Sequence, residues 1–293
     1  MLGNRLSPSP CACNLSAESP AVPAATRSHD ARGALLEVLD SWIQHTRLHA
    51  NAALAAPMSA YMRQQFPFLG LPGEARKRQQ QDLWANLTRA GFVGGKGRQG
   101  TGSGPDQRTA TLERRREASS VLVSCIDLLW EQPEREFHYT AMELAWKYRV
   151  YWGDDWPVQV HRWIQSKSWW DTVDWWAPNG LGLYFLGSPA DRKEATFRHR
   201  ARDEMDFLHR HSNLWMQRSA LIFQLKWKEN TDFEGLCAMC LNTSGTKEFF
   251  LAKAMGWALR QHAKLNPTAV RHFVANNPQL PSLTRREALK HLR

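Results

Sequence analysis

The spacing of apolar residues along the chain is the feature that most constrains its fold. Apolar residues recur every three or four positions, as in Leu35, Leu39, Trp42 and Ile43. This spacing places side chains on one face of an α-helix, whereas a half-buried strand needs alternation with a period of two. No convincing alternating segment occurs anywhere in the sequence. We therefore predict an all-α protein.

Proline, glycine and N-capping residues divide this pattern into separate helices. Helices are predicted from Ala34, from Pro57, over residues 74–89, from Arg114, over 156–165, from Asn213, over 232–241 and 246–261, from Asn266, and from Ser282 or Thr284. Pairs of helices joined by short breaks recur roughly every 35–45 residues, which is typical of a HEAT-like α-solenoid, a curved superhelix of stacked antiparallel helix pairs. No strict sequence repeat accompanies this pattern.

Two segments differ in composition from the helical remainder. Residues 1–33 are rich in Ser, Ala and Pro and lack an apolar signal core, so we expect a disordered tail; an organellar transit segment is the alternative. Residues 91–106 are rich in glycine but lack the Gly-Lys-Ser/Thr ending of a phosphate loop, so we interpret them as a flexible insertion. The rest, residues 34–293, is predicted to form one domain.

The balance of charges favours a polyanionic partner. The chain has 38 Lys and Arg against 28 Asp and Glu, a net charge of +10, which suits nucleic acid or an anionic membrane surface. No apolar run approaches the roughly 18 residues of a membrane-spanning helix. The five cysteines form neither a disulfide framework nor a zinc-ligand pattern, so we expect an intracellular protein, cytoplasmic or nuclear, with no metal.

Residues 168–176, Ser-Trp-Trp-Asp-Thr-Val-Asp-Trp-Trp, contain four tryptophans and two aspartates. Ser168 and Asp171 have the spacing of a capping box, so a helix is expected to begin here with Asp171 as a capping residue. Trp170 and Asp174 are four residues apart and share a helix face. An aromatic plane beside a carboxylate suits a planar cationic group. The alternative is a core tryptophan beside a solvated aspartate.

Other segments offer cations and aromatic rings at helical spacing. Lys253, Trp257 and Arg260 share one helix face, Arg218 lies in a separate helix, and Tyr61 precedes a Phe-Pro-Phe-Leu-Gly turn. If the stacked helices bring these faces together, they form a basic groove with an aromatic cleft and one carboxylate.

Five blocks of sequence resemble, in the same order, a known family, the DNA alkylation repair (AlkD-like) HEAT-repeat DNA glycosylases. The resemblance extends from about residue 35 to the C-terminus, and its blocks are Tyr-Met-Arg-Gln-Gln-Phe-Pro-Phe-Leu-Gly (61–70), Leu-Trp-Glu-Gln-Pro-Glu-Arg-Glu-Phe (129–137), Lys-Ser-Trp-Trp-Asp-Thr-Val-Asp (167–174), Trp-Met-Gln-Arg (215–218) with Phe-Gln-Leu-Lys (223–226), and Lys-Glu-Phe-Phe (247–250) through Gly-Trp-Ala-Leu-Arg (256–260).

The resemblance implies a solenoid that wraps duplex DNA and hydrolyses the glycosidic bond of cationic purines alkylated at N3 or N7, such as 3-methyladenine and 7-methylguanine. It implies a monofunctional enzyme that leaves the damaged base stacked, needs no cofactor and acts as a monomer. The roles implied are catalysis for Asp174, pocket walls for Trp170 and Trp257, a grip on the DNA backbone for Arg218 and the cleft edge for Tyr61. Helical facing, independently of the resemblance, suggests phosphate contacts for Lys253 and Arg260.

The sequence departs from the family pattern in two respects. Pro72 replaces a polar residue that can touch DNA in some members, and residues 91–106 and 180–202 appear as insertions. A second hypothesis is a non-catalytic HEAT-repeat nucleic-acid-binding or scaffold protein. Asp174 between two tryptophans argues against it, because a carboxylate in a DNA-facing cleft repels phosphate.

Overall fold

The fold is taken from a computed structural model, which describes residues 24–90, 105–188 and 195–292. Over these ranges the chain contains helices and no strands, as predicted. The α-helices are α1 (Ala24–Arg47), α2 (Ala52–Tyr61), α3 (Gly73–Arg89), α4 (Pro105–Glu131), α5 (Arg135–Lys147), α6 (Trp156–Gln165), α7 (Trp170–Trp175), α8 (Leu183–Leu186), α9 (Ala195–Arg210), α10 (Leu214–Ile222), α11 (Phe233–Asn242), α12 (Phe249–Ala263), α13 (Pro267–Asn276) and α14 (Ser282–Ala288).

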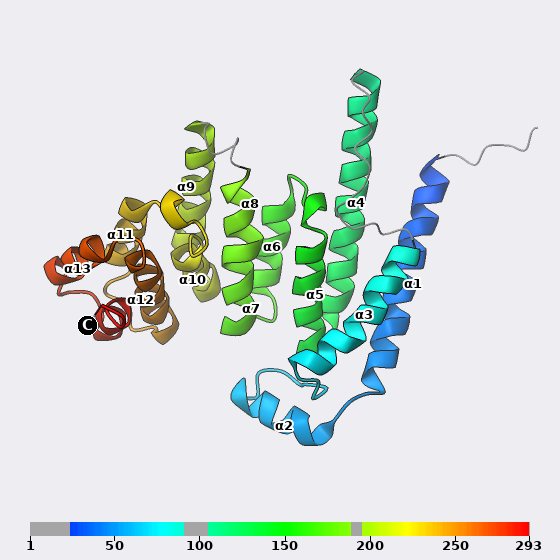
Figure 1. Ribbon diagram of the computed structural model, residues 1–293, viewed down its shortest axis with the longest axis horizontal. Helices are drawn as coiled ribbons and strands as arrows, with labels where there is room; N and C mark the ends of the chain where they lie inside the picture. Colours follow the sequence, from blue (N-terminus) through cyan, green and yellow to red (C-terminus); the bar gives the residue numbers. More distant parts are fainter. Residues whose placement is uncertain (1–23, 91–104, 189–194, 293) are drawn as a thin grey trace, which may run out of the picture.

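The helices stack in chain order (Figure 1). Buried apolar residues on their inner faces form one continuous core. α1 and α4 lie at one end of the row, α5 to α10 form its middle, and α11 to α14 form the other end. This arrangement confirms the predicted HEAT-like α-solenoid. None of the described helices combines the length and apolar character that crossing a bilayer requires.

Two predicted helix starts are confirmed by their caps. The Asn213 side chain accepts hydrogen bonds from the backbone N–H groups of Trp215 (2.8 Å) and Met216 (3.3 Å). The Asn266 side chain accepts one from Ala269 (3.0 Å). Such caps satisfy N–H groups that have no partner inside the helix.

One other predicted start is wrong, and the predicted cap of α14 is absent although that helix begins at Ser282 as expected. α2 begins at Ala52, because Asn51 caps it and the alanine-rich stretch before Pro57 has high helix propensity, so Pro57 lies inside the helix. α14 has no side-chain cap; the Thr284 hydroxyl instead donates to the Ala252 carbonyl (2.8 Å) and ties α14 to α12.

The boundaries of the compositionally distinct segments also differ from the prediction. α1 begins at Ala24, inside the expected tail, and α4 begins at Pro105. Residues 1–23 and 91–104 lie outside the described residues, so the tail and most of the glycine-rich insertion remain predictions. Residues 180–202, which the sequence comparison with the family suggests are an insertion, are helical wherever they are described apart from a short break after α8.

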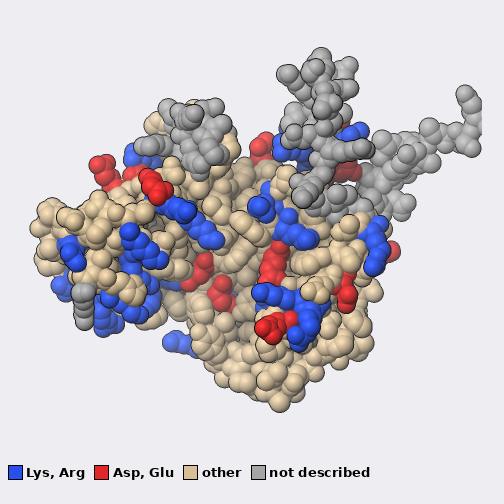
Figure 2. Space-filling model, in the orientation of Figure 1, with Lys and Arg blue, Asp and Glu red and all other residues tan. Residues whose placement is uncertain are grey.

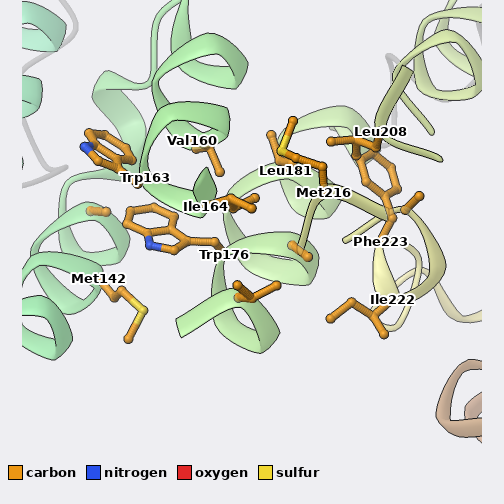
Figure 3. Packing of buried hydrophobic residues seen from close by; sticks show 14 of the residues in the cluster. Met142, Val160, Trp163, Ile164, Trp176, Leu181, Leu208, Met216, Ile222 and Phe223 are labelled. Atoms are coloured by element: carbon orange, nitrogen blue, oxygen red, sulfur yellow. The ribbon is translucent and has the colours of Figure 1, made fainter. Parts of the chain in front are cut away.

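A tryptophan core lies behind α7, the helix on which Trp170 and Asp174 fall. A π-helix, Trp176–Gly182, continues directly from α7 and is buried along its whole length. Trp176 stacks on Trp163 with ring centroids 4.8 Å apart (Figure 3). The buried indoles of Trp156 and Trp227 donate hydrogen bonds to the carbonyls of Gly180 (3.0 Å) and Gly182 (2.8 Å).

These contacts explain how so short a helix is held in place. α7 has 6 residues, too few to be stable alone, so its orientation derives from the packing behind it. Several of the 14 tryptophans of the chain are therefore core residues.

A close helix contact at the C-terminal end gives a test of the packing. A Cβ added at Gly256 in α12 would lie 2.5 Å from Cβ of Glu287 and 2.9 Å from the Thr284 carbonyl oxygen. Overpacking of this kind costs about 1–3 kcal/mol. We expect Gly256→Ala to lower Tm by several degrees in a thermal scan. Gly73→Ala, where nothing lies within 4 Å, is the control and should not lower Tm; equal Tm values for the two variants would contradict the contact.

Candidate active site

Four helices or their flanking turns surround one cleft of about 420 Å³. It is lined by Tyr61 and Arg63 at the end of α2, Trp169, Trp170 and Asp174 at α7, Arg218 on α10, and Phe249, Phe250, Lys253, Trp257 and Arg260 on α12. All seven residues singled out from the sequence line this cleft. Arg63, Trp169, Phe249 and Phe250 line it too and were not singled out.

Asp174 is the carboxylate of the cleft. Its side chain is 17% exposed and accepts two hydrogen bonds from Arg218, at 2.7 Å to Nε and 2.8 Å to Nη2. Burial raises the pKa of Asp174, the hydrogen bonds and charge of Arg218 oppose that rise, and the nearby charge of Asp171 adds to it. Asp174 is thus a desolvated carboxylate held in one orientation.

Arg218, which the resemblance assigns to the DNA backbone, is paired inside the protein. Its side chain is only 4% exposed, and besides the pair with Asp174 its Nη1 donates to the Phe250 carbonyl (2.5 Å). The guanidinium therefore uses its donors in hydrogen bonds to Asp174 and to the backbone of α12. The grip on the DNA backbone that the resemblance implies stays a prediction, and the pairing of Arg218 with Asp174 is a feature that the sequence did not indicate.

Aromatic rings line the same cleft as the carboxylate. The Tyr61 ring meets Trp170 edge to face, with centroids 6.0 Å apart. Trp169 packs against Trp215 (5.6 Å) and Phe250 (5.3 Å). Adjacent aromatic residues such as Phe249 and Phe250 were the available sequence signal for this wall, but a pair of phenylalanines in a helix more often marks core.

Asp171 is predicted to cap α7, but it does not. Ser168 and Asp171 make no capping hydrogen bonds there; the Ser168 hydroxyl donates to the Ile164 carbonyl (2.6 Å). Asp171 instead accepts bonds from the buried Arg135, at 2.9 Å to Nε and 2.6 Å to Nη2, and from the Tyr139 hydroxyl (2.7 Å). A buried arginine needs a charged partner, and that need outweighs the local cap.

The other donors of Arg135 make hydrogen bonds to α7 itself, to the chain before it and to α5. Nη2 also donates to the Thr172 hydroxyl (2.9 Å), and Nη1 donates to the Lys167 carbonyl (2.9 Å) and lies 3.1 Å from Nδ1 of His138. Burial lowers the pKa of His138 to about 3, and the charge of Arg135 adds to this, so the imidazole is neutral and Nδ1 is an acceptor. All five guanidinium donors therefore have partners.

The residue after Arg135 fastens the opposite side of the cleft. The buried carboxylate of Glu136 accepts backbone N–H bonds from Leu69 (3.0 Å), Gly70 (2.9 Å) and Leu71 (3.1 Å), in the turn that follows Tyr61 and Arg63. Gly70 has φ +82°, and a side chain there would meet the Asn51 carbonyl. Arg135 and Glu136 together set the positions of both walls.

Lys253 and Arg260 share a single carboxylate. Glu287 of α14 accepts bonds from the Lys253 ammonium (2.7 Å) and from Arg260. The three groups carry a net charge of +1, less than helical facing alone suggested. Lys and Arg atoms nevertheless gather over the C-terminal helices (Figure 2).

The fold and the cleft together define a class: an α-solenoid whose central cleft combines a buried carboxylate, aromatic walls and cationic side chains. Residues 102–292, more than half of the chain, match the model of the DNA alkylation repair enzyme family. The chain belongs to this family. Membership makes it a DNA alkylation repair enzyme, and DNA is the substrate that the family implies.

A solved structure agrees with this assignment. The chain is 28% identical to a predicted DNA alkylation repair enzyme from Enterococcus faecalis, with a TM-score of 0.62, and the match covers 83% of this chain and 97% of that one. No curated protein matches the sequence.

The shared carboxylate gives a pH test. The hydrogen bonds and charges of Lys253 and Arg260 lower the pKa of Glu287 from 4.5 to about 2, so the stability that this ionised group contributes is present above pH 4.5 and is lost as pH falls toward 2. We expect Glu287→Gln to unfold at lower urea than wild type at neutral pH, and this gap to narrow below pH 4.5.

Asp206→Asn is the control, because Asp206 is 61% exposed and lies 3.5 Å from Arg210. It should differ little from wild type at any pH. A difference in urea stability between wild type and Glu287→Gln that stays constant below pH 4.5 would contradict the pairing of Glu287 with Lys253 and Arg260.

Proposed function

We propose that the protein is a monofunctional DNA glycosylase that hydrolyses the N-glycosidic bond of cationic purines alkylated at N3 or N7, such as 3-methyladenine and 7-methylguanine, in duplex DNA. The observation that carries this proposal is the desolvated carboxylate of Asp174 in an aromatic cleft. We further propose that the base is released without being flipped into a pocket, since the cleft is open and shared by four helices.

The chemistry follows from the charge of the substrate. Alkylation at N3 or N7 makes the purine cationic, so the base leaves with the electron pair of its bond to C1′ and is neutral on departure. The sugar then gains oxocarbenium character, and water adds to C1′ and loses a proton. Asp174 stabilises the developing cation and orients the water.

The electrostatic stabilisation that Asp174 can provide is sufficient only for a base with a labile glycosidic bond. At ~4 Å and an effective dielectric constant near 20, a unit charge pair contributes roughly 4 kcal/mol. If most of this arises only in the transition state, the rate rises about a thousandfold. Selectivity for cationic lesions then comes from the instability of the lesion itself.

The neighbouring residues have distinct proposed roles. Trp170 and Trp257 hold the deoxyribose and stabilise its charge by cation–π attraction, about 1–2 kcal/mol when desolvated. Tyr61 extends this surface at the cleft edge. Arg218 keeps Asp174 ionised and oriented, and Lys253 and Arg260 supply the field that attracts phosphate.

The test is release of 7-methylguanine or 3-methyladenine from a methylated duplex. We expect release by wild type and a loss of a hundredfold or more for Asp174→Asn. Asp127→Asn is the matched control, because Asp127 also accepts two bonds from one arginine, Arg162, but lies outside the cleft; it should retain activity per folded molecule.

Other outcomes point elsewhere. DNA binding with no base released by wild type would favour the non-catalytic nucleic-acid-binding or scaffold hypothesis. Equal release by wild type and Asp174→Asn would mean that the reaction does not use this carboxylate.

The pH profile tests the role given to Arg218. Arg218 lowers the pKa of Asp174 against the effect of burial, so Arg218→Gln should raise that pKa further. Asp174 would then be protonated at higher pH, and the acid limb of the single-turnover rate should move to higher pH once spontaneous base loss is subtracted. Lys253→Gln, which alters the cleft without touching Asp174, should leave the limb in place. An unshifted limb for Arg218→Gln would contradict the role.

A further inference from the structure

Four cations line the cleft, and their partners differ. Arg218 is paired with Asp174, while Lys253 and Arg260 are paired with Glu287. Within the described part of the chain, the guanidinium of Arg63 makes no hydrogen bond and no ion pair. Its side chain is exposed at the end of α2.

We propose that Arg63 binds a phosphate of the DNA backbone at the mouth of the cleft. This inference rests on the DNA substrate of the proposed function. A free guanidinium presents a planar set of donors that matches two phosphate oxygens, and in this cleft it is the cation whose binding breaks no existing pair.

The backbone supports a functional reason for arginine at this position. Arg63 and Gln64 both have left-handed conformations, with φ of 55° and 59°. Residues other than glycine occupy this region at a cost and persist there only when the surroundings impose it. Here the N–H groups of Arg63 and Gln64 donate to the carbonyls of Ala60 and Ser59, both at 2.9 Å. These bonds fix the turn, but they do not require an arginine side chain.

The position suits a phosphate next to the reacting nucleotide. Tyr61 lies on the same turn, and its ring contacts Trp170 on the helix that carries Asp174. Glu136 anchors the chain just after this turn. A phosphate held by Arg63 would therefore fix the strand relative to the aromatic wall and the carboxylate.

Salt dependence of binding measures the contact directly. We would titrate an undamaged duplex by fluorescence anisotropy over a range of salt concentrations. Each phosphate contact contributes about 0.9 to the slope of log K against log salt, so Arg63→Gln should lose about 0.9 of slope and bind about eightfold more weakly at ~0.1 M salt. Arg63→Lys should keep most of the slope.

The charge-matched control is Arg149→Gln. Arg149 is exposed, packs over Trp146 and lies outside the cleft, so this variant removes one charge without removing the contact. A slope for Arg63→Gln equal to that of wild type, or an equal loss for Arg149→Gln, would overturn the proposal.

A glycine variant separates binding from stability. Arg63→Gly suits the left-handed backbone, so its Tm should match or exceed that of wild type while its DNA binding falls as for Arg63→Gln. A lower Tm with unchanged binding would mean that the residue is structural and would overturn the proposal.

The base-release assay distinguishes the two levels of inference. Loss of slope in Arg63→Gln with no base released by wild type would sustain the phosphate contact and reject the glycosylase. If wild type releases the base and Arg63→Gln keeps the salt slope and the KM of wild type, the glycosylase proposal stands and the phosphate contact is rejected.

Discussion

The cleft depends on one buried charge, the guanidinium of Arg135. A charge removed from water is tolerated only when every donor is satisfied. Arg135 meets this condition with acceptors from α5, the chain before α7 and α7 itself. Its guanidinium carbon also lies 3.8 Å from the centroid of the Phe66 ring. Because these partners come from separate segments, the arginine can be satisfied only when the segments are correctly placed. This requirement, together with the tryptophan packing behind α7, fixes the orientation of α7 and with it that of Asp174.

Pairing of charged side chains within the protein also explains the electrostatics of the cleft. Asp174 is paired with Arg218, and Glu287 takes up both Lys253 and Arg260. A wide cluster of like charges would repel itself in a partly desolvated cleft, and internal pairing limits that cost. As a consequence, the carboxylate of Asp174 is held in one orientation. The attraction of the cleft for an anion comes from a small excess of positive charge. That balance is compatible with the proposed substrate, a DNA whose backbone is anionic and whose damaged base is cationic.

The helices could largely be predicted from sequence, because the period of apolar residues and the asparagine caps are local signals. Asn213 and Asn266 act as predicted, whereas Pro57 lies inside a helix and the Ser168–Asp171 capping pattern is not formed. These failures share a cause. Each local signal competes with another interaction, an earlier cap at Asn51 or the buried Arg135, and the spacing of residues carries no information about which one prevails.

The sequence by itself determined the helical class, the solenoid and seven of the residues that line the cleft, since apolar period and helix facing depend on neighbours in the chain. Only the tertiary structure decided how the charges pair, because ion pairs such as Arg218 with Asp174, or Lys253 with Glu287, join residues 44 and 34 positions apart. It also revealed Arg63, whose significance lies in having no partner among the described residues while the other cations of the cleft have one. A property that depends on what all neighbouring groups have bound appears only when those groups are in place.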